Sequence, residues 1–242
     1  MKIDKELIKI IETLNGQLGI FPHGKEIIHL LNRFFKEGET IQQATFKFID
    51  ALCGQYGLIV LIADHPALKK QMTSVFRDDL LKQLASDIVE ETSKKLDENY
   101  KIQAKPREIN LFYMVDEIRS RIELVNDHYV VHGTRLAFSK DEILNELEMH
   151  PERFSPNVIL RAVFQETILP NVAFIGGGGE LAYWLQLKGL FNHYQVPFPV
   201  LVLRNSFLII EERWKSLAQK LNLDLDDIFL PTEEIINKKV TE

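Results

Sequence analysis

Apolar residues recur at helical spacing along the first hundred residues. The pattern predicts three helices, over 2–14, 25–36 and 41–53. The apolar run Leu58–Ala63 then predicts a buried strand. Pro66 begins a helical run that is free of glycine and proline as far as Tyr100. This half of the chain therefore combines helices with one strand.

Strand-like patterns follow. The run Leu111–Met114 predicts a strand, and the turn residues Asn126-Asp127 between Arg121–Val125 and Tyr129–Val131 predict a hairpin. Further along, the spacing predicts a helix that Ser155-Pro156 caps and starts. These features indicate an α/β chain with a hairpin.

A strand, a turn and a helix are predicted after Pro170, which ends the preceding helix. Val172–Ile175 is the expected strand, and the four glycines Gly176–Gly179 turn into a helix from Glu180. Backbone without Cβ atoms can approach a ligand closely, and a helix start attracts anions. The same glycines could equally form a tight structural turn. Gly176 and Gly177 are thus candidate ligand-binding residues, and Glu180 is either a helix-start carboxylate or a base.

The helix before this turn has two faces. Asn157, Arg161 and Gln165 recur every four residues on one face, which predicts a binding surface. The other face, which we expect to pack, carries Leu160, Phe164 and Ile168.

Composition narrows the range of partners. The 242 residues carry a formal charge of −6 and contain no basic stripe. We therefore expect small molecules as partners and no nucleic acid. No apolar run is long enough to cross a membrane, and the single cysteine suits a reducing compartment, so we expect a cytoplasmic protein. The histidines lack ligand spacing, and no metal site is expected.

Several polar residues are candidates for substrate binding. A guanidinium matches a carboxylate with two hydrogen bonds, so three arginines are candidates for anion recognition, although each could instead pair at the surface. They are Arg107, Arg161 and Arg204. Neutral amides suit sugar hydroxyls or could cap turns. They are Asn110, Asn157, Gln165 and Asn171. Tyr183 is the aromatic residue expected to touch a sugar ring, and Trp184 is expected in the core.

Three segments carry a resemblance to a known family. They are KPREINLFY at 105–113, HPERFSPNVILRAVFQE at 150–166 and LPNVAFIGGGGELAYWLQLK at 169–188. They resemble the bacterial cysteine-adding enzymes of bacillithiol synthesis, the cysteine ligases, and the likeness covers most of residues 40–204. The resemblance implies an α/β fold, a Rossmann-like core with helical and β-hairpin insertions. We interpret 1–242 as one such unit, with 95–150 as the hairpin-containing insertion.

The chain also departs from the family pattern. Family members are longer, with an amino-terminal segment containing Gly-His-Gln and a carboxy-terminal coiled coil, and neither is found in these residues. We therefore expect a central fragment of a longer enzyme, which alone need not be active. Gly178 stands where the family usually has a stiffer residue such as proline.

The resemblance implies a ligase that forms an amide between L-cysteine and the amine of glucosaminyl malate. Activation by ATP or ADP is expected, as is a homodimer formed through segments absent here. In this scheme the arginines hold carboxylates, and Glu180 or Glu166 takes a proton from the attacking amine. Two alternatives stay open: a non-catalytic substrate- or nucleotide-binding fragment, or a sugar-nucleotide transferase-like domain whose glycine turn holds a diphosphate.

Overall fold

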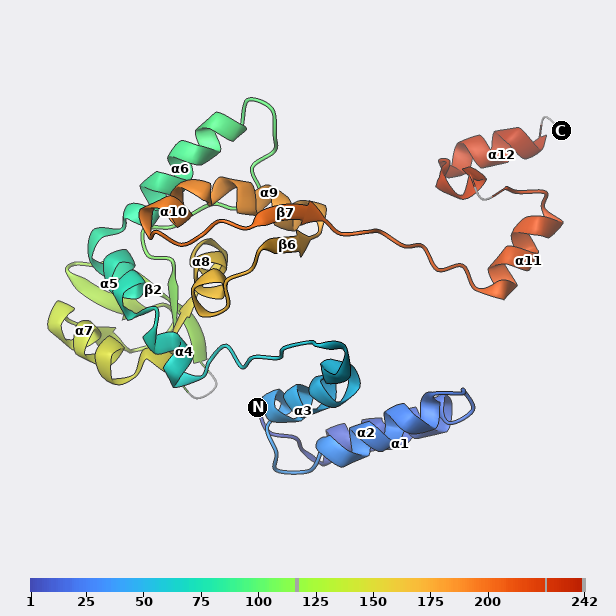
Figure 1. Ribbon diagram of the computed structural model, residues 1–242, viewed down its shortest axis with the longest axis horizontal. Coiled ribbons are helices and arrows are strands. Elements are labelled where there is room, and N and C mark those ends of the chain that lie inside the picture. Colours follow the sequence, from blue (N-terminus) through green and yellow to red (C-terminus); the bar gives the residue numbers. More distant parts are fainter. Residues whose placement is uncertain (116–117, 225, 241–242) are drawn as a thin grey trace. The chain divides into compact units, whose positions relative to one another are not determined.

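A computed structural model gives the fold and describes residues 1–115, 118–224 and 226–240 (Figure 1). The first three helices are α1 (Lys5–Leu18), α2 (Gly24–Phe34) and α3 (Ile41–Cys53), followed by the short 3-10 turn η1 (Gly54–Tyr56). The Asp4 carboxylate caps α1, and the Thr40 hydroxyl caps α3. All three predicted helices are confirmed within a few residues of their expected ends.

The predicted strand Leu58–Ala63 is wrong. These residues have no regular secondary structure, and Ile59 keeps 65% of its surface exposed. Within the described part of the chain no strand pairs with the segment, so its apolar, β-branched composition alone does not make it a strand.

The long helical run after Pro66 is divided. It forms three helices, α4 (Pro66–Lys70), α5 (Thr73–Lys82) and α6 (Leu84–Leu96). Gln83 has a φ of 56°, which breaks the helix between α5 and α6. The break gives α5 and α6 different directions, so that Phe76 and Val89 can both be fully buried in one core.

An antiparallel sheet forms in the middle of the chain, with strand order β4-β3-β2-β1-β5. Its strands are β1 (Leu111–Val115), β2 (Ile118–Val125), β3 (His128–Val131), β4 (Ala137–Phe138) and β5 (Phe154–Pro156). The predicted hairpin is confirmed: Asn126 and Asp127, with φ of 49° and 60°, link β2 and β3. The expected insertion 95–150, in which 116–117 lie outside the described residues, supplies four of these strands.

The helix expected to start at Ser155-Pro156 begins later. Ser155 and Pro156 belong to β5, and the helix α8 (Val158–Ile168) has Asn157 as its N-cap. The Asn157 side-chain oxygen accepts hydrogen bonds from the backbone N–H groups of Ile159 and Leu160. Proline is tolerated at Pro156 because β5 is an edge strand. The helix α7 (Lys140–Met149) and the short 3-10 turn η2 (Pro151–Arg153) precede β5 in the chain.

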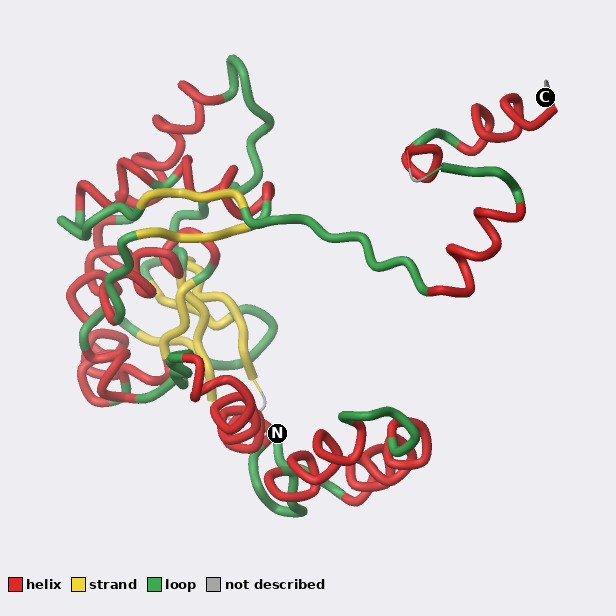
Figure 2. Tube along the Cα trace, turned by 45° about the vertical axis from the view of Figure 1, so that its right-hand side comes forward, coloured by secondary structure: helices red, strands yellow, loops and turns green. Residues whose placement is uncertain are grey.

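The predicted strand, turn and helix around the glycines are confirmed. Strand β6 (Ala173–Gly176) leads into α9 (Gly178–Gln186), which is followed by α10 (Lys188–His193) and β7 (Val200–Leu203). Strands β6 and β7 form a separate two-stranded sheet, visible apart from the larger sheet in Figure 2. Both α9 and α10 pack against α6.

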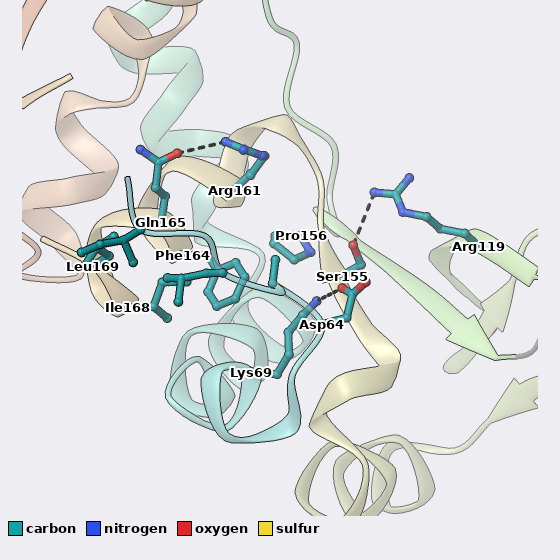
Figure 3. Close-up of a pocket in the computed structure, with 13 residues that line it drawn as sticks. Asp64, Lys69, Arg119, Ser155, Pro156, Arg161, Phe164, Gln165, Ile168 and Leu169 are labelled. Carbon is teal, nitrogen blue, oxygen red and sulfur yellow. Dashed lines mark hydrogen bonds and ion pairs between the residues drawn. The ribbon is translucent and has the colours of Figure 1, made fainter. Parts of the chain in front are cut away.

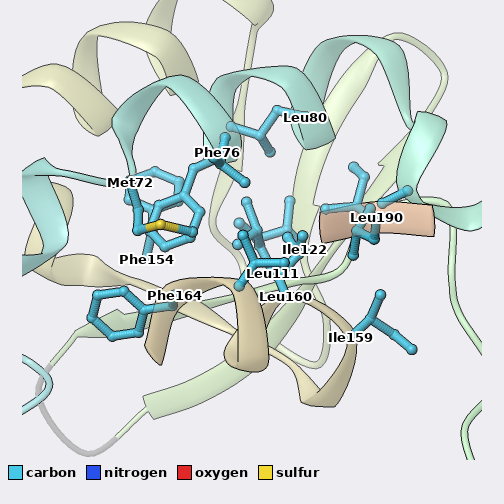
Figure 4. Close-up of a cluster of buried hydrophobic side chains, with 14 of the residues drawn as sticks. Met72, Phe76, Leu80, Leu111, Ile122, Phe154, Ile159, Leu160, Phe164 and Leu190 are labelled. Atoms are coloured by element: carbon cyan, nitrogen blue, oxygen red, sulfur yellow. The ribbon is translucent and has the colours of Figure 1, made fainter. Parts of the chain in front are cut away.

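The hydrophobic core lies between the helices and the five-stranded sheet (Figure 4). Phe76 from α5, Leu160 from α8 and Ile122 from β2 all have at most 1% of their surface exposed. Trp184 is fully buried as expected and stacks on Phe174, with ring centroids 4.0 Å apart. This core fixes α8 and the strands beside it, which carry the candidate site.

The chain divides into two compact units, Met1–Val202 and Leu203–Glu242, where the sequence was interpreted as one. Residues 204–211, between β7 and the next helix, have no regular secondary structure, and Ile209 keeps 89% of its surface exposed. The second unit contains α11 (Glu212–Lys220), η3 (Asp226–Phe229) and α12 (Thr232–Val240). In the described ranges, no helix is both long and apolar enough to cross a membrane.

Candidate functional site

Two adjoining pockets in the first unit share Arg119, Pro156 and Arg161. We call the first, with a volume of about 490 Å³, the cationic groove. Its charged lining consists of Lys105, Arg107, Arg119, Arg121 and Arg161, with no acidic residue among its described lining. We call the second, of about 470 Å³, the apolar pocket, because Phe164, Ile168 and Leu169 form much of its wall.

The cations of the groove come from three elements. Lys105 and Arg107 lie in the segment before β1, Arg119 and Arg121 alternate on β2, and Arg161 is on α8. Residues two apart on a strand share a face, so β2 directs both arginines into the groove.

Two groove arginines have contacts that define their orientation. The Arg119 guanidinium lies 4.0 Å from the centre of the Phe112 ring and 3.4 Å from the Ser155 hydroxyl. Arg121 forms an ion pair of 2.7 Å with Glu123. That pair reduces the positive charge of the groove by about one, and the remaining cations still favour a ligand with several negative charges.

Lys69 is the unusual charge of the apolar pocket (Figure 3). Only 1% of its surface is exposed, and its ammonium donates a 2.7 Å hydrogen bond to the Phe154 carbonyl oxygen. The Asp64 carboxylate lies 3.4 Å away. Burial lowers the pKa of Lys69, and Asp64 opposes that shift. Asp64 is the one acidic residue in the described lining of either pocket.

Four of the predicted site residues meet here. Arg107, Asn157 and Arg161 line the cationic groove, and Arg161 and Gln165 line the apolar pocket. Arg161 donates a 3.2 Å hydrogen bond to the Gln165 side-chain oxygen, as Figure 3 shows. The predicted polar face of α8 therefore points into both pockets.

Asn110 lines neither pocket. It is fully buried, and its side chain forms hydrogen bonds with Asp79, Arg107 and Asn157. The sequence alone could not separate this role from sugar binding, because an asparagine suits both. Its place is inside the protein, behind the groove.

Glu166 and Asn171, two further predicted site residues, are joined by hydrogen bonds. Glu166 is 1% exposed and accepts hydrogen bonds from the Asn171 backbone N–H at 2.8 Å and the Asn171 side-chain amide at 3.0 Å. Gln165 donates a third, at 3.1 Å. This geometry holds the turn between α8 and β6.

The glycine turn is separate from both pockets. Gly176 ends β6, and Gly177 is the N-cap of α9, where its N–H donates a 2.7 Å hydrogen bond to the Glu180 carboxylate. Tyr183 is half-buried against the core. None of these residues lines the groove or the apolar pocket, and Arg204 belongs to the second unit.

Four cations of the site were not singled out from the sequence. They are Lys69, Lys105, Arg119 and Arg121. The i, i+2 spacing of Arg119 and Arg121 beside a predicted hairpin could have indicated a charged strand face. No sequence pattern identifies Lys69 as a buried site residue, because a lysine in an amphipathic helix normally faces water. As for metals, the described residues contain no group of three or more His, Cys, Asp or Glu placed to hold one.

Fold and site together define a domain of helices and sheets that carries a groove lined by cations. Residues 1–205 match the family model of "Bacillithiol biosynthesis BshC, N-terminal Rossmann-like domain", and the chain belongs to this family. The matched domain is the amino-terminal one, whereas the sequence was interpreted as a central fragment.

Named relatives agree with this assignment. The chain is 41% identical over 98% of its length to a protein of Flavobacterium psychrophilum and 40% identical over 96% to one of Flavobacterium johnsoniae. Both are named "Putative cysteine ligase BshC". The matches cover 45% and 44% of those proteins, so the chain spans less than half of their length.

Proposed function

We propose that this chain supplies the acceptor-binding domain of a ligase that joins L-cysteine to glucosaminyl malate in bacillithiol biosynthesis. The observation that carries the proposal is the cationic groove, which places Arg107 and Arg161 with three further cations around one cavity. A malate group carries two carboxylates, and guanidinium groups bind carboxylates with paired hydrogen bonds.

The apolar pocket is the proposed place of the reacting amine. Arg119 and Arg161 line both pockets, so a malate held by them in the groove would direct the attached amino sugar into the neighbouring pocket. Asp64 lines that pocket with its side chain 47% exposed, which leaves it accessible to a ligand. We assign to Asp64 the binding of the ammonium form and the removal of a proton as the amine attacks.

This assignment differs from the roles expected for Glu166 and Glu180. The hydrogen bonds to Glu166 come from Asn171 and Gln165, and the carboxylate is buried. Glu180 bonds to the start of its own helix. A base must reach the proton that it removes, and Asp64 is the acidic group that lines the pocket.

A nucleotide, ATP or ADP, is the proposed activator of the cysteine carboxyl group. Because this chain covers less than half of its relatives, the groups that hold the nucleotide and complete catalysis can lie in the remaining part. A binding role for this domain, with the chemistry shared by another segment, is the second candidate. It is favoured by the absence of a second acidic residue from the described pocket linings.

A calorimetric titration of this chain with glucosaminyl malate, with and without ATP or ADP, tests the proposal. Saturable binding that Arg107→Ala or Arg161→Ala weakens would support the groove as the acceptor site. If both variants bind as the original chain does, the groove is not the site. A nuclear magnetic resonance titration with a diphosphate tests the transferase-like alternative. Shifts in the resonances of Gly176 and Gly177 would favour it.

A further inference from the structure

A buried hydrogen-bond network lies directly behind the cationic groove. At its centre Asn110 has 0% of its surface exposed, and beside it Asp79, from α5, is equally buried. The Asn110 backbone N–H donates to Asp79 at 2.6 Å, and its side-chain amide donates to the other Asp79 oxygen at 3.1 Å. Nothing in the proposed binding step uses this carboxylate directly.

Asn110 connects two parts of the groove. Its side-chain oxygen accepts from the Arg107 backbone N–H at 3.1 Å and from the Asn157 side-chain amide at 2.9 Å. Its amide also donates to the Arg107 carbonyl oxygen at 2.8 Å. Asn157 in turn caps α8, which carries Arg161. All four hydrogen-bonding positions of the Asn110 side chain are therefore used within the protein.

We infer that Asp79 is a positioning residue for the cationic groove: its ionised carboxylate orients Asn110, which holds Arg107 and the start of α8 in the anion-binding arrangement. The inference rests on the proposed function for the ligand. Both groups that face the carboxylate are donors, so the partner must be an acceptor at both oxygens. An asparagine or a protonated acid would place a donor against a donor on one side.

The charges around Asp79 make this arrangement sensitive to pH. Burial raises the pKa of Asp79 to about 7, although the two hydrogen bonds from Asn110 lower it. The neighbouring Asp78 raises the pKa further. The Asp78 carboxylate forms an ion pair with Lys82 at 2.7 Å, accepts a hydrogen bond from the Tyr194 hydroxyl at 3.2 Å and lies 3.4 Å from the His193 ring. As pH falls through about 7, Asp79 gains a proton, and the network loses one of its acceptors.

Titration calorimetry with L-malate from pH 6 to pH 8 tests the inference. L-malate has no amine, and its carboxyl groups stay ionised throughout this range. The affinity of the original chain should fall by about tenfold from pH 8 to pH 6, since a group with a pKa near 7 is mostly protonated at pH 6. We call this fall in affinity between pH 8 and pH 6 the step. Asp79→Asn should bind L-malate about tenfold more weakly than the original chain at pH 8, and its affinity should not show the step.

Two control variants separate the groups involved. Asp78→Asn should keep the affinity at pH 8 and move the step to lower pH, because it removes the charge that raises the pKa of Asp79. His132→Gln should keep the step, although His132 contacts Arg121. A step that persists in Asp79→Asn, or one that disappears in His132→Gln, would overturn the inference.

A readout without ligand distinguishes this inference from the proposed function. In a nuclear magnetic resonance titration of the original chain, the backbone amides of Asn110 and Arg107 should shift together with a midpoint near pH 7. If L-malate does not bind at any pH while these amides titrate, the proposed malate site fails and the Asp79 network stands. If the amides do not titrate, the positioning role fails.

Discussion

The Lys69 ammonium donates a 2.7 Å hydrogen bond to the carbonyl oxygen of Phe154 and thereby joins α4 to β5. The two residues are 85 positions apart in the sequence. Lys69 is 1% exposed, and its ammonium lies 5.4 Å from the centre of the Phe164 ring. A charge buried in this way links the base of the apolar pocket to the edge of the five-stranded sheet.

Replacing Lys69 by methionine should destabilise the fold. The methionine fills a similar volume but leaves the Phe154 carbonyl oxygen buried without its donor, at a cost of about 1–3 kcal/mol in the free energy of unfolding. Urea unfolding measures the change. Lys70→Met, at the exposed next position of α4, is the control and should leave stability nearly unchanged. Equal stabilities for the two variants would show that the Lys69 hydrogen bond contributes little.

Arg161→Ala should weaken the binding of glucosaminyl malate by about ten- to a hundredfold, because a hydrogen bond to a charged group contributes about 1.5–3 kcal/mol. Arg161 lines both pockets, so its loss affects the ligand at their junction. Calorimetry at constant salt gives the dissociation constant. The matched control is Arg135→Ala, an exposed arginine outside both pockets. Comparable losses in the two variants would indicate attraction by overall charge alone.

Glu166→Gln should reduce stability by about 1–3 kcal/mol, because the new amide group places a donor against the donors of Asn171. The thermal midpoint of unfolding reports this change. Glu90→Gln on the exposed face of α6 serves as the comparison and should have little effect. A Glu166→Gln protein of unchanged stability would return Glu166 to the list of candidate bases.

Gly178→Pro should stabilise the chain by about 0.4–1 kcal/mol, since proline restricts the unfolded state at a position where the native backbone accepts it. Gly178 is the first residue of α9, and an added Cβ would meet nothing within 4 Å. Gly177 before it has the extended backbone that proline requires, with φ −72° and ψ 166°. Thermal unfolding measures the gain.

The contrasting variant is Gly57→Pro. Gly57 has a φ of 82°, which proline cannot adopt, so this variant should be destabilised. A destabilised Gly178→Pro would mean that the start of α9 needs the flexibility of glycine, as a ligand-binding turn would.

Sequence patterns predicted the fold best where local chemistry decides the structure. The hairpin at Asn126-Asp127 follows from residues that tolerate the positive φ that its turn requires. The strand expected at Leu58–Ala63 failed because strand formation depends on a pairing partner, which composition cannot supply. The break at Gln83 was missed for a similar reason, since packing of the core imposes it on a residue with no turn preference.

The candidate site was predicted only in part. The four-residue spacing on α8 identified Arg161 and Gln165, because helical periodicity is local. Arg119 and Lys69 reach the same pocket from β2 and α4, and only the tertiary fold brings them there. Asn110 was a candidate for ligand binding, and the structure shows its side chain hydrogen-bonded to Asp79 and Asn157. An asparagine suits both roles, so the residue type alone does not separate them.

The Asp79 carboxylate should also change the stability of the fold with pH. Its pKa is about 7 in the folded protein, against an ordinary value of 3.8, so the folded state holds a proton that the unfolded state releases between about pH 4 and pH 7. The contribution of Asp79 to stability is therefore greatest at low pH and decreases as pH rises through this window.

Glu146 acts in the opposite direction. Its pKa is lowered by hydrogen bonds from Tyr113 and Arg153 that outweigh its burial, so it stabilises the fold above its ordinary pKa and loses that effect in acid. The stability of the original chain sums both contributions. The difference between this chain and Asp79→Asn isolates the part that comes from Asp79.

Urea unfolding at pH 5, 6, 7 and 8 should show the original chain losing stability relative to Asp79→Asn as pH rises, by a few kcal/mol in total, on the order expected for a pKa shift of this size. The ionised state that orders the groove would then be the state that costs the fold most, a conflict typical of functional sites. A difference that stays constant with pH would show that Asp79 keeps one protonation state throughout, and the pH dependence inferred for the groove would fail with it.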